Sequence, residues 1–187
     1  MNACESILGL SPYQGGKPIE ELARELGLSK ISKLASNENP LGVSEKVQKA
    51  INDSLSNLNR YPDGNCFELK EAIAKKHGVS SSMVSLGNGS NELLELIARV
   101  FVSEHTDEVI FSQYAFVVYP LVTQALGATA VVSPANKFGH DLDAMLSLIS
   151  NQTKLIFVAN PNNPTGTLLS DDEVYSFLKQ VPSNIPV

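Results

Sequence analysis

The sequence has few cysteines, few basic residues and no long apolar run, and each shortage argues against a class of protein. Its two cysteines, Cys4 and Cys66, form neither a CxxC pair nor a disulfide framework, so a reducing cytoplasm is expected. The 14 Lys and Arg against 20 Asp and Glu give a net charge of −6, which leaves no basic footprint for nucleic acid or for an anionic membrane. The longest apolar stretches, such as residues 155–159, are too short to span a bilayer. The first ten residues also lack the basic start and apolar core of a secretory signal.

From about residue 67, strand-like and helix-like segments alternate along the chain. Apolar residues at helical spacing predict helices over 67–77, 91–102, 116–126 and 142–149. A capping box that begins at Ser170 predicts a further helix, which ends near residue 180. Short apolar runs predict strands over 83–86, 108–111, 129–132 and 154–159. This alternation predicts an α/β fold with a mostly parallel sheet flanked by helices, and functional loops beyond the carboxyl ends of the strands.

The N-terminal part has a different character. Residues 1–42 are rich in turns and contain one short amphipathic helix over 19–26, which Gly27 ends; another helix begins at Ser44. We therefore expect an N-terminal arm over 1–42 and the N-terminal part of a large domain over 43–187. The last six residues predict a loop that enters a strand, so this large domain is expected to be truncated at its C-terminal end.

A glycine-containing junction lies at residues 86–92, between a predicted strand and a predicted helix. Free backbone N–H groups and the positive end of the helix dipole can hold a phosphate at such a place. Gly89 would let a ligand approach the backbone closely, and Ser90 adds a hydroxyl. The junction is neither a Walker A loop nor a dinucleotide fingerprint. A tight turn with a Ser or Asn helix cap is the structural alternative.

Residues 159–166 form the second unusual stretch, directly after a predicted apolar strand. Two Asn-Pro steps and a glycine predict a stiff turn at the carboxyl end of that strand. The amide of Asn163 can both donate and accept a hydrogen bond, so it could contact an oxygen of a ligand. The alternative is a turn that serves only to connect a strand to a helix.

Together these stretches carry a resemblance to a known family. Residues 160–166 resemble the Asn-Pro-Asn-Asn-Pro-Thr-Gly turn of the fold-type I aminotransferases that depend on pyridoxal 5'-phosphate. Residues 12–13 with 16–22, 33–42 and 59–64 closely resemble the start of the histidinol-phosphate aminotransferases. The similarity runs from about Leu10 to the last residue. The motifs in combination are specific for the superfamily and less specific for the substrate.

The resemblance implies a pyridoxal 5'-phosphate site with contacts from three stretches. The positions matching Gly89, Ser90 and Asn91 bind the cofactor phosphate. The position matching Phe116 stacks on the pyridine ring, and the one matching Asn163 hydrogen-bonds the phenolic oxygen. Without the family, Phe116 would equally be taken for a core or helix-face aromatic.

Three further positions are implied by the resemblance. In a homodimer, the residue matching Tyr61 reaches the cofactor phosphate of the partner subunit. Tyr13 and Asn37 match positions in the arm that borders the substrate. For Tyr13, a tyrosine that anchors a mobile arm is an equal alternative.

The resemblance also implies which catalytic groups to expect elsewhere. Transamination needs a Schiff-base lysine, an acid against the pyridine nitrogen and an arginine for the substrate, and the family has them after the position that matches Val187. Lys137, Lys154 and Lys179 do not lie in such a context. No catalytic residue is therefore expected in this chain. No metal site is expected either, because His77, His105 and His140 lack ligand-like spacing.

The implied function is that of a fragment of a histidinol-phosphate:2-oxoglutarate aminotransferase, an enzyme of histidine biosynthesis. Its substrates would be glutamate or 2-oxoglutarate and imidazole-acetol phosphate. The alternatives are an aromatic aminotransferase or a threonine-phosphate decarboxylase on the same scaffold, or a non-catalytic module that binds a phosphate ligand. All but the last require Ser90, Phe116 and Asn163 to meet at one edge of a parallel sheet.

Overall fold

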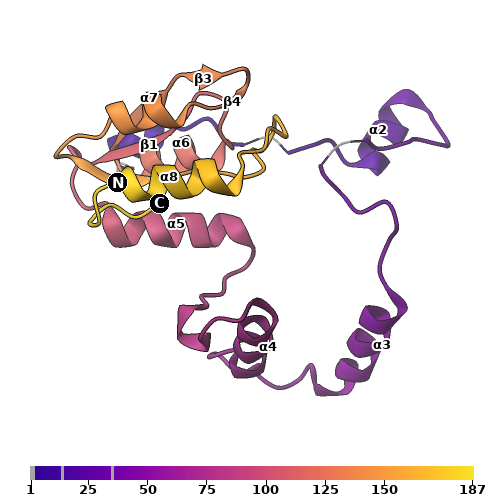
Figure 1. Ribbon diagram of the computed structural model, residues 1–187. Coiled ribbons are helices and arrows are strands. Elements are labelled where there is room, and N and C mark those ends of the chain that lie inside the picture. Colours follow the sequence, from indigo (N-terminus) through magenta and orange to yellow (C-terminus); the bar gives the residue numbers. More distant parts are fainter. Residues whose placement is uncertain (1–2, 14, 35) are drawn as a thin grey trace. The chain divides into compact units, whose positions relative to one another are not determined.

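The computed structural model describes residues 3–13, 15–34 and 36–187, which form two compact units (Figure 1). Of the described residues, one unit combines those in 3–12 with 85–187, and the other contains those between positions 13 and 84. Residues 1, 2, 14 and 35 of the expected arm lie outside the described residues. The boundary expected between residues 42 and 43 separates the arm from the large domain of the whole protein. It stays a prediction.

A parallel sheet of three strands lies at the centre of the larger unit. Its order is β2 (Thr129–Ser133), β1 (Glu108–Ser112) and β5 (Thr153–Ile156), and both neighbouring pairs are parallel. The middle strand β1 is apolar and almost fully buried from residue 109 onward, as expected for a parallel strand covered on both faces. The predicted fold class is confirmed.

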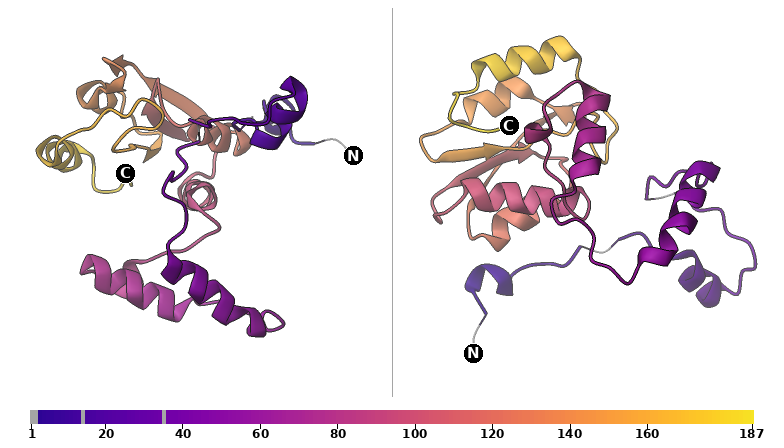
Figure 2. Two further views of the ribbon diagram at one scale, coloured as in Figure 1. Left: turned by 90° about the vertical axis from the view of Figure 1, so that its right-hand side faces the viewer. Right: turned by 90° about the horizontal axis from the view of Figure 1, so that it is seen from below.

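Helices cover the two faces of this sheet (Figure 2). Alternate residues of the strands point to opposite faces. On one face, Val109, Phe111 and Leu155 pack with α5 (Ser90–Phe101) and α6 (Val118–Ala125). On the other, Ile110 and Ile156 pack with α7 (Leu142–Ser147) and α8 (Asp171–Gln180).

The structure differs from the predicted secondary structure in one strand and one hairpin. Residues 83–86 form no strand: a 3-10 turn, η2 (Ser81–Met83), leads into the extended residue Val84. An extended segment becomes a strand only when it pairs with a neighbour, and the three strands of the sheet leave this segment unpaired. A short hairpin of β3 (Ala135–Asn136) and β4 (Gly139–His140) was not predicted, because it is too short to show a periodic pattern.

The C-terminal residues lie beside β5. The backbone N–H of Ile156 donates to the carbonyl of Pro186 at 3.1 Å, and Ile185 is buried in the core. The segment that was expected to enter a strand therefore runs along the edge of β5 that faces away from β1, although it forms no assigned strand.

The unit of residues 13–84 is mainly helical. It contains α2 (Ile19–Leu26), α3 (Glu45–Ser54), the 3-10 turn η1 (Leu55–Asn57) and α4 (Phe67–His77). Gly27 and Gly78 end α2 and α4 in the left-handed conformation, as their positions predicted. A short helix α1 (Glu5–Leu8) belongs to the larger unit, where Ser6 Oγ donates to the Ala125 carbonyl of α6. None of the described helices is long and apolar enough to cross a membrane.

Candidate functional site

The carboxyl edge of the sheet gathers three of the predicted stretches. The strand β1 leads into residues 113–117, here called the aromatic loop, and β5 leads into residues 157–170, within which residues 159–169 are called the asparagine turn. Only residues 102–107 separate the end of α5 from the start of β1, so α5 runs antiparallel to β1 and begins at the carboxyl edge (Figure 1). The structure thus brings Gly89–Asn91, Phe116 and Asn163 to one edge.

The start of α5 offers free backbone donors. Gly89 precedes the helix with φ of +84° and ψ of 173°, and its start receives no side-chain cap from the described residues. A Cβ atom at Gly89 would meet none of their atoms within 4 Å, so the space beside this glycine is open. The first N–H groups of a helix have no partner within it. Ser90 and Asn91 are exposed there.

Glu92, which was not among the predicted site residues, organises the loop before this helix. Its Oε2 accepts hydrogen bonds from the backbone N–H and the Nδ2 of Asn88, the latter at 3.1 Å. An acidic residue in the first turn of the predicted helix over 91–102 was the available signal, since such a residue can bond backward.

The aromatic loop places Phe116 between core and surface. Phe116 is half-buried, and its ring lies perpendicular to that of Tyr119, at an interplanar angle of 88° and a centroid distance of 6.1 Å. Tyr119 in turn stacks on Phe157 at 4.5 Å with the planes 6° apart. Burial raises the pKa of the Tyr119 hydroxyl. Tyr119 is therefore a core residue, whereas Phe116 keeps part of its surface accessible.

The asparagine turn is closed by its own side chains. Asn160 bonds the backbone of Leu169 twice, with Nδ2 donating to the carbonyl at 3.0 Å and Oδ1 accepting from the N–H at 2.8 Å. The peptide bonds that precede Pro161 and Pro164 are cis. Asn163 is half-buried. No hydrogen bond joins its amide to another residue in the described part of the chain.

The β3–β4 hairpin packs against the asparagine turn. His140 Nε2 bonds the Ala159 carbonyl at 2.9 Å. A Cβ at Gly139 would lie 3.2 Å from Thr167 Oγ1, so a larger residue there would press on the turn. No sequence pattern predicts this contact, because the hairpin itself is too short to recognise.

Three polar atoms at this edge are buried without a hydrogen-bond partner in the described residues. They are Ser112 Oγ, at the end of β1, His140 Nδ1, in the β3–β4 hairpin, and Asn162 Oδ1, in the asparagine turn. All three residues are at most 7% exposed. Buried polar residues of this kind cannot be distinguished from surface turn residues in a sequence.

The other predicted site residues lie in the unit of residues 13–84. Tyr61 is fully exposed, Tyr13 is 57% exposed, and Asn37 has a left-handed backbone with φ of 51°. Their roles at the cofactor and the substrate stay predictions.

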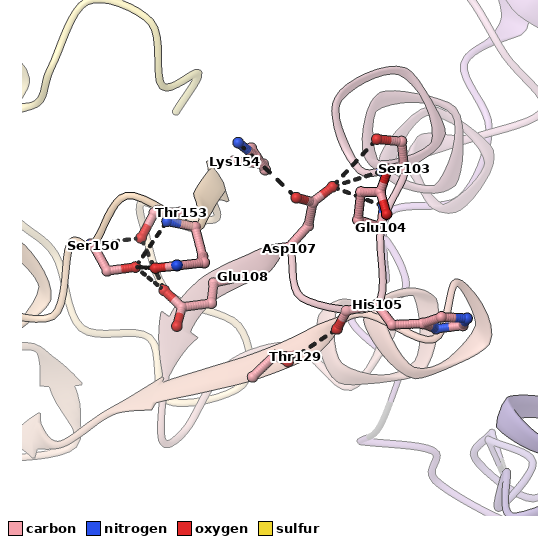
Figure 3. Close-up of polar contacts among 10 residues, drawn as sticks. Ser103, Glu104, His105, Asp107, Glu108, Thr129, Ser150, Thr153 and Lys154 are labelled. Carbon is pink, nitrogen blue, oxygen red and sulfur yellow. Dashed lines mark hydrogen bonds and ion pairs between the residues drawn. The ribbon is translucent and has the colours of Figure 1, made fainter.

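A second polar cluster lies at the amino edge of the sheet (Figure 3). Asp107 Oδ2 accepts from the N–H groups of Ser103 and Glu104 at 2.8 and 2.9 Å, and Lys154 Nζ lies 4.0 Å from Oδ1. The bond from Ser103 is the main reason that the pKa of Asp107 is held below its usual range. The hydrogen bonds and the charge of Asp107 are satisfied by its neighbours in the cluster, so we assign the cluster a structural role. Over the described residues, no group of three His, Cys, Asp or Glu could hold a metal ion.

Comparison with known proteins identifies the family. Residues 29–187 match the family model described as aminotransferase class I and II. The chain belongs to the class I and II aminotransferases.

Several relatives in this family carry a narrower description. Over 185 residues the chain is 57% identical to histidinol-phosphate aminotransferase 2 of Haemophilus influenzae strain 86-028NP, covering 99% of this chain and 50% of that protein. It is 59% identical over 181 residues to histidinol-phosphate aminotransferase 1 of Mannheimia succiniciproducens, covering 97% of this chain and 49% of the relative. The chain spans about half the length of the curated relatives it matches.

A solved structure of an aminotransferase agrees with this assignment. The crystal structure of histidinol-phosphate aminotransferase from Sinorhizobium meliloti, in complex with pyridoxal-5'-phosphate, superposes with a TM-score of 0.85 at 25% identity. The match covers 97% of this chain and 48% of that one. The predicted resemblance is confirmed.

Proposed function

We propose that this chain forms part of the cofactor site of a pyridoxal 5'-phosphate-dependent aminotransferase that exchanges an amino group between histidinol phosphate and 2-oxoglutarate. The observation that carries the proposal is the meeting of Gly89–Asn91, Phe116 and Asn163 at one edge of the sheet, in a chain 57–59% identical to histidinol-phosphate aminotransferases. The descriptions of these relatives favour this substrate over the aromatic and decarboxylase alternatives.

The residues at the carboxyl edge fit such a cofactor. The open space beside Gly89 and the start of α5, which no described side chain caps, suit a phosphate group. The accessible part of Phe116 suits a planar ring, and the unengaged amide of Asn163 suits a ring oxygen. When bound, the cofactor supplies the electron sink that amino transfer requires.

Each of these residues would contribute binding or orientation. The N–H groups of Ser90 and Asn91 would neutralise phosphate charge without a basic side chain, since the helix dipole adds to them. Phe116 would fix the plane of the ring and exclude water from one face. Asn163 would donate to the phenolic oxygen and hold negative charge there, which changes how readily the bound group gives up a proton.

The chain on its own is proposed not to transaminate. Lys154 faces Asp107 at the amino edge, Lys179 lies over the Tyr175 ring at 4.4 Å, and Lys137 is exposed on the β3–β4 turn. None matches the family's Schiff-base position. For the whole protein we propose a cytoplasmic homodimer in which Tyr61 reaches the partner's cofactor phosphate and Tyr13 and Asn37 border the substrate; the support is the resemblance of the N-terminal motifs.

A chimaera tests the proposed function. This chain would replace the matching half of the Haemophilus influenzae relative, and amino transfer between histidinol phosphate and 2-oxoglutarate would be measured. The chimaera should be active, while the isolated chain should not exceed a blank of cofactor alone. Asn163→Ala in the chimaera should lower activity about ten- to a hundredfold, the range expected for one hydrogen bond to a charged group.

Asn151→Ala is the matched control, because Asn151 is an exposed asparagine outside the carboxyl edge. It should leave the activity of the chimaera unchanged. A folded chimaera without amino transfer, or an Asn163→Ala variant as active as the control, would contradict the proposal.

A further inference from the structure

Asn162 is the buried centre of the asparagine turn. It is 3% exposed. Its Nδ2 donates both protons, to the Tyr114 carbonyl at 3.0 Å and to Thr165 Oγ1 at 2.7 Å. Its backbone N–H donates to the Thr167 carbonyl, and its carbonyl accepts from the Gly166 N–H, each at 2.8 Å. The side chain and the backbone of one residue thus fix the shape of the turn.

The bond to Tyr114 joins two separate loops. Tyr114 belongs to the aromatic loop, two residues before Phe116, and Asn162 directly precedes Asn163. The bond spans 48 positions of the sequence. Because the two protons of an amide are fixed in one plane, holding one on Thr165 directs the other toward the aromatic loop.

Asn160 shows what a purely local asparagine does in the same turn. It is exposed, and both of its bonds go to Leu169. It closes the asparagine turn without contacting the aromatic loop. Only Asn162, of these two, connects the loops that carry Phe116 and Asn163.

The burial of Asn162 has an energetic cost. Its Oδ1 has no partner in the described part of the chain, and burial of an unpaired acceptor opposes folding. An apolar side chain would avoid that penalty but would offer no donor to either loop. The amide is therefore explained by the link it makes rather than by burial.

We propose that Asn162 is a positioning residue that sets the spacing between Phe116 and Asn163 at the cofactor. The inference rests on the proposed function for the meaning of that spacing. The link itself can be tested in the chain without any ligand.

The test compares backbone amide resonances of the isotope-labelled 187-residue chain and three variants. Asn162→Ala should shift the amides of residues 114–117. Thr165→Val removes the acceptor that orients the same amide, so it should shift these amides in the same direction but less. Asn160→Ala, which removes both bonds to Leu169, should leave them in place. Unchanged amides in Asn162→Ala, or equal shifts in Asn160→Ala, would overturn the inference.

Binding gives a second readout that separates positioning from folding. Pyridoxine 5'-phosphate is a suitable probe because it lacks the aldehyde that reacts with lysines. Asn162→Ala should weaken its binding about tenfold, as expected for one buried hydrogen bond, and should leave binding of inorganic phosphate unchanged. Equal weakening of both ligands would show a general loss of structure and overturn the positioning role.

The two proposals can fail separately. If the unmodified chain binds no pyridoxine 5'-phosphate, the proposed function fails, while the amide comparison still decides whether Asn162 links the loops. If Asn162→Ala does not fold, the unmodified chain is decisive: the Asn162 Nδ2 protons should exchange slowly and show through-space contacts to residue 114. Fast exchange without those contacts would overturn the link.

Discussion

Asp107 and Asn162 are polar residues buried at opposite edges of the same sheet, and they are stabilised differently. Asp107 is 4% exposed and accepts two backbone N–H bonds. Asn162 instead donates both protons of its amide, and its oxygen has no partner among the residues that the structure describes. Asp107 thereby holds the connection between α5 and β1 in shape. Replacing Asp107 should therefore lower the free energy of unfolding, whereas replacing Asn162 should change the geometry of the site.

Replacing Asp107 by Ala should lower the free energy of unfolding at pH 7 by about 1–3 kcal/mol, since the N–H groups of Ser103 and Glu104 lose a charged partner. Because its pKa is lowered in the folded state, the carboxylate stabilises the fold above its unfolded pKa of about 4. That contribution is lost as the pH falls through the lower folded pKa.

Urea denaturation of the wild type and the Asp107→Ala variant between pH 7 and pH 2 measures the contribution of the carboxylate to the free energy of unfolding. The difference between the two proteins should be largest at neutral pH and shrink below about pH 4. Asp143→Ala is the control, because Asp143 is an exposed acid of α7. A difference that stays constant with pH would contradict the role of the Asp107 charge.

At the scale of elements, helix ends were the most predictable features. The capping box at Ser170 and the glycines at positions 27 and 78 mark helix ends at the residues where the structure has them. Caps are local: the side chain and the N–H it bonds lie within four residues, so the sequence contains both partners.

Ser170→Ala should destabilise the larger unit by about 1 kcal/mol, because the Glu173 N–H loses its acceptor. The loss should be visible in thermal denaturation followed by circular dichroism. Ser176→Ala, an exposed serine inside the same helix, should cause no loss, since Ala favours helix at least as well as Ser. Equal destabilisation by both substitutions would contradict the capping role.

Pairing between distant segments was much less predictable. The strand expected over 83–86 has the right composition but no neighbour, and the β3–β4 hairpin has a neighbour but almost no length. Similarly, the sequence indicated Asn163 from its motif but not the buried link from Asn162 to Tyr114. Strand pairs and bonds between loops depend on which distant segments come into contact, and the packing of the sheet determines those contacts.

At the scale of the molecule, the described residues form two units of different character. The unit with the sheet has two apolar cores, one under each helix layer. In the unit of residues 13–84, Ala74 is the one buried residue among those described. The candidate site residues Ser90, Phe116 and Asn163 all belong to the unit with the cores, where a rigid sheet can hold their spacing.

The most direct measurement is therefore a titration of the isotope-labelled chain with pyridoxine 5'-phosphate, followed through its backbone amides. If the start of α5, the aromatic loop and the asparagine turn form one half-site, the amides of Gly89–Asn91, Phe116 and Asn163 should shift together and saturate at one ligand concentration. Shifts at only one of these stretches, or shifts scattered over the surface without saturation, would contradict it.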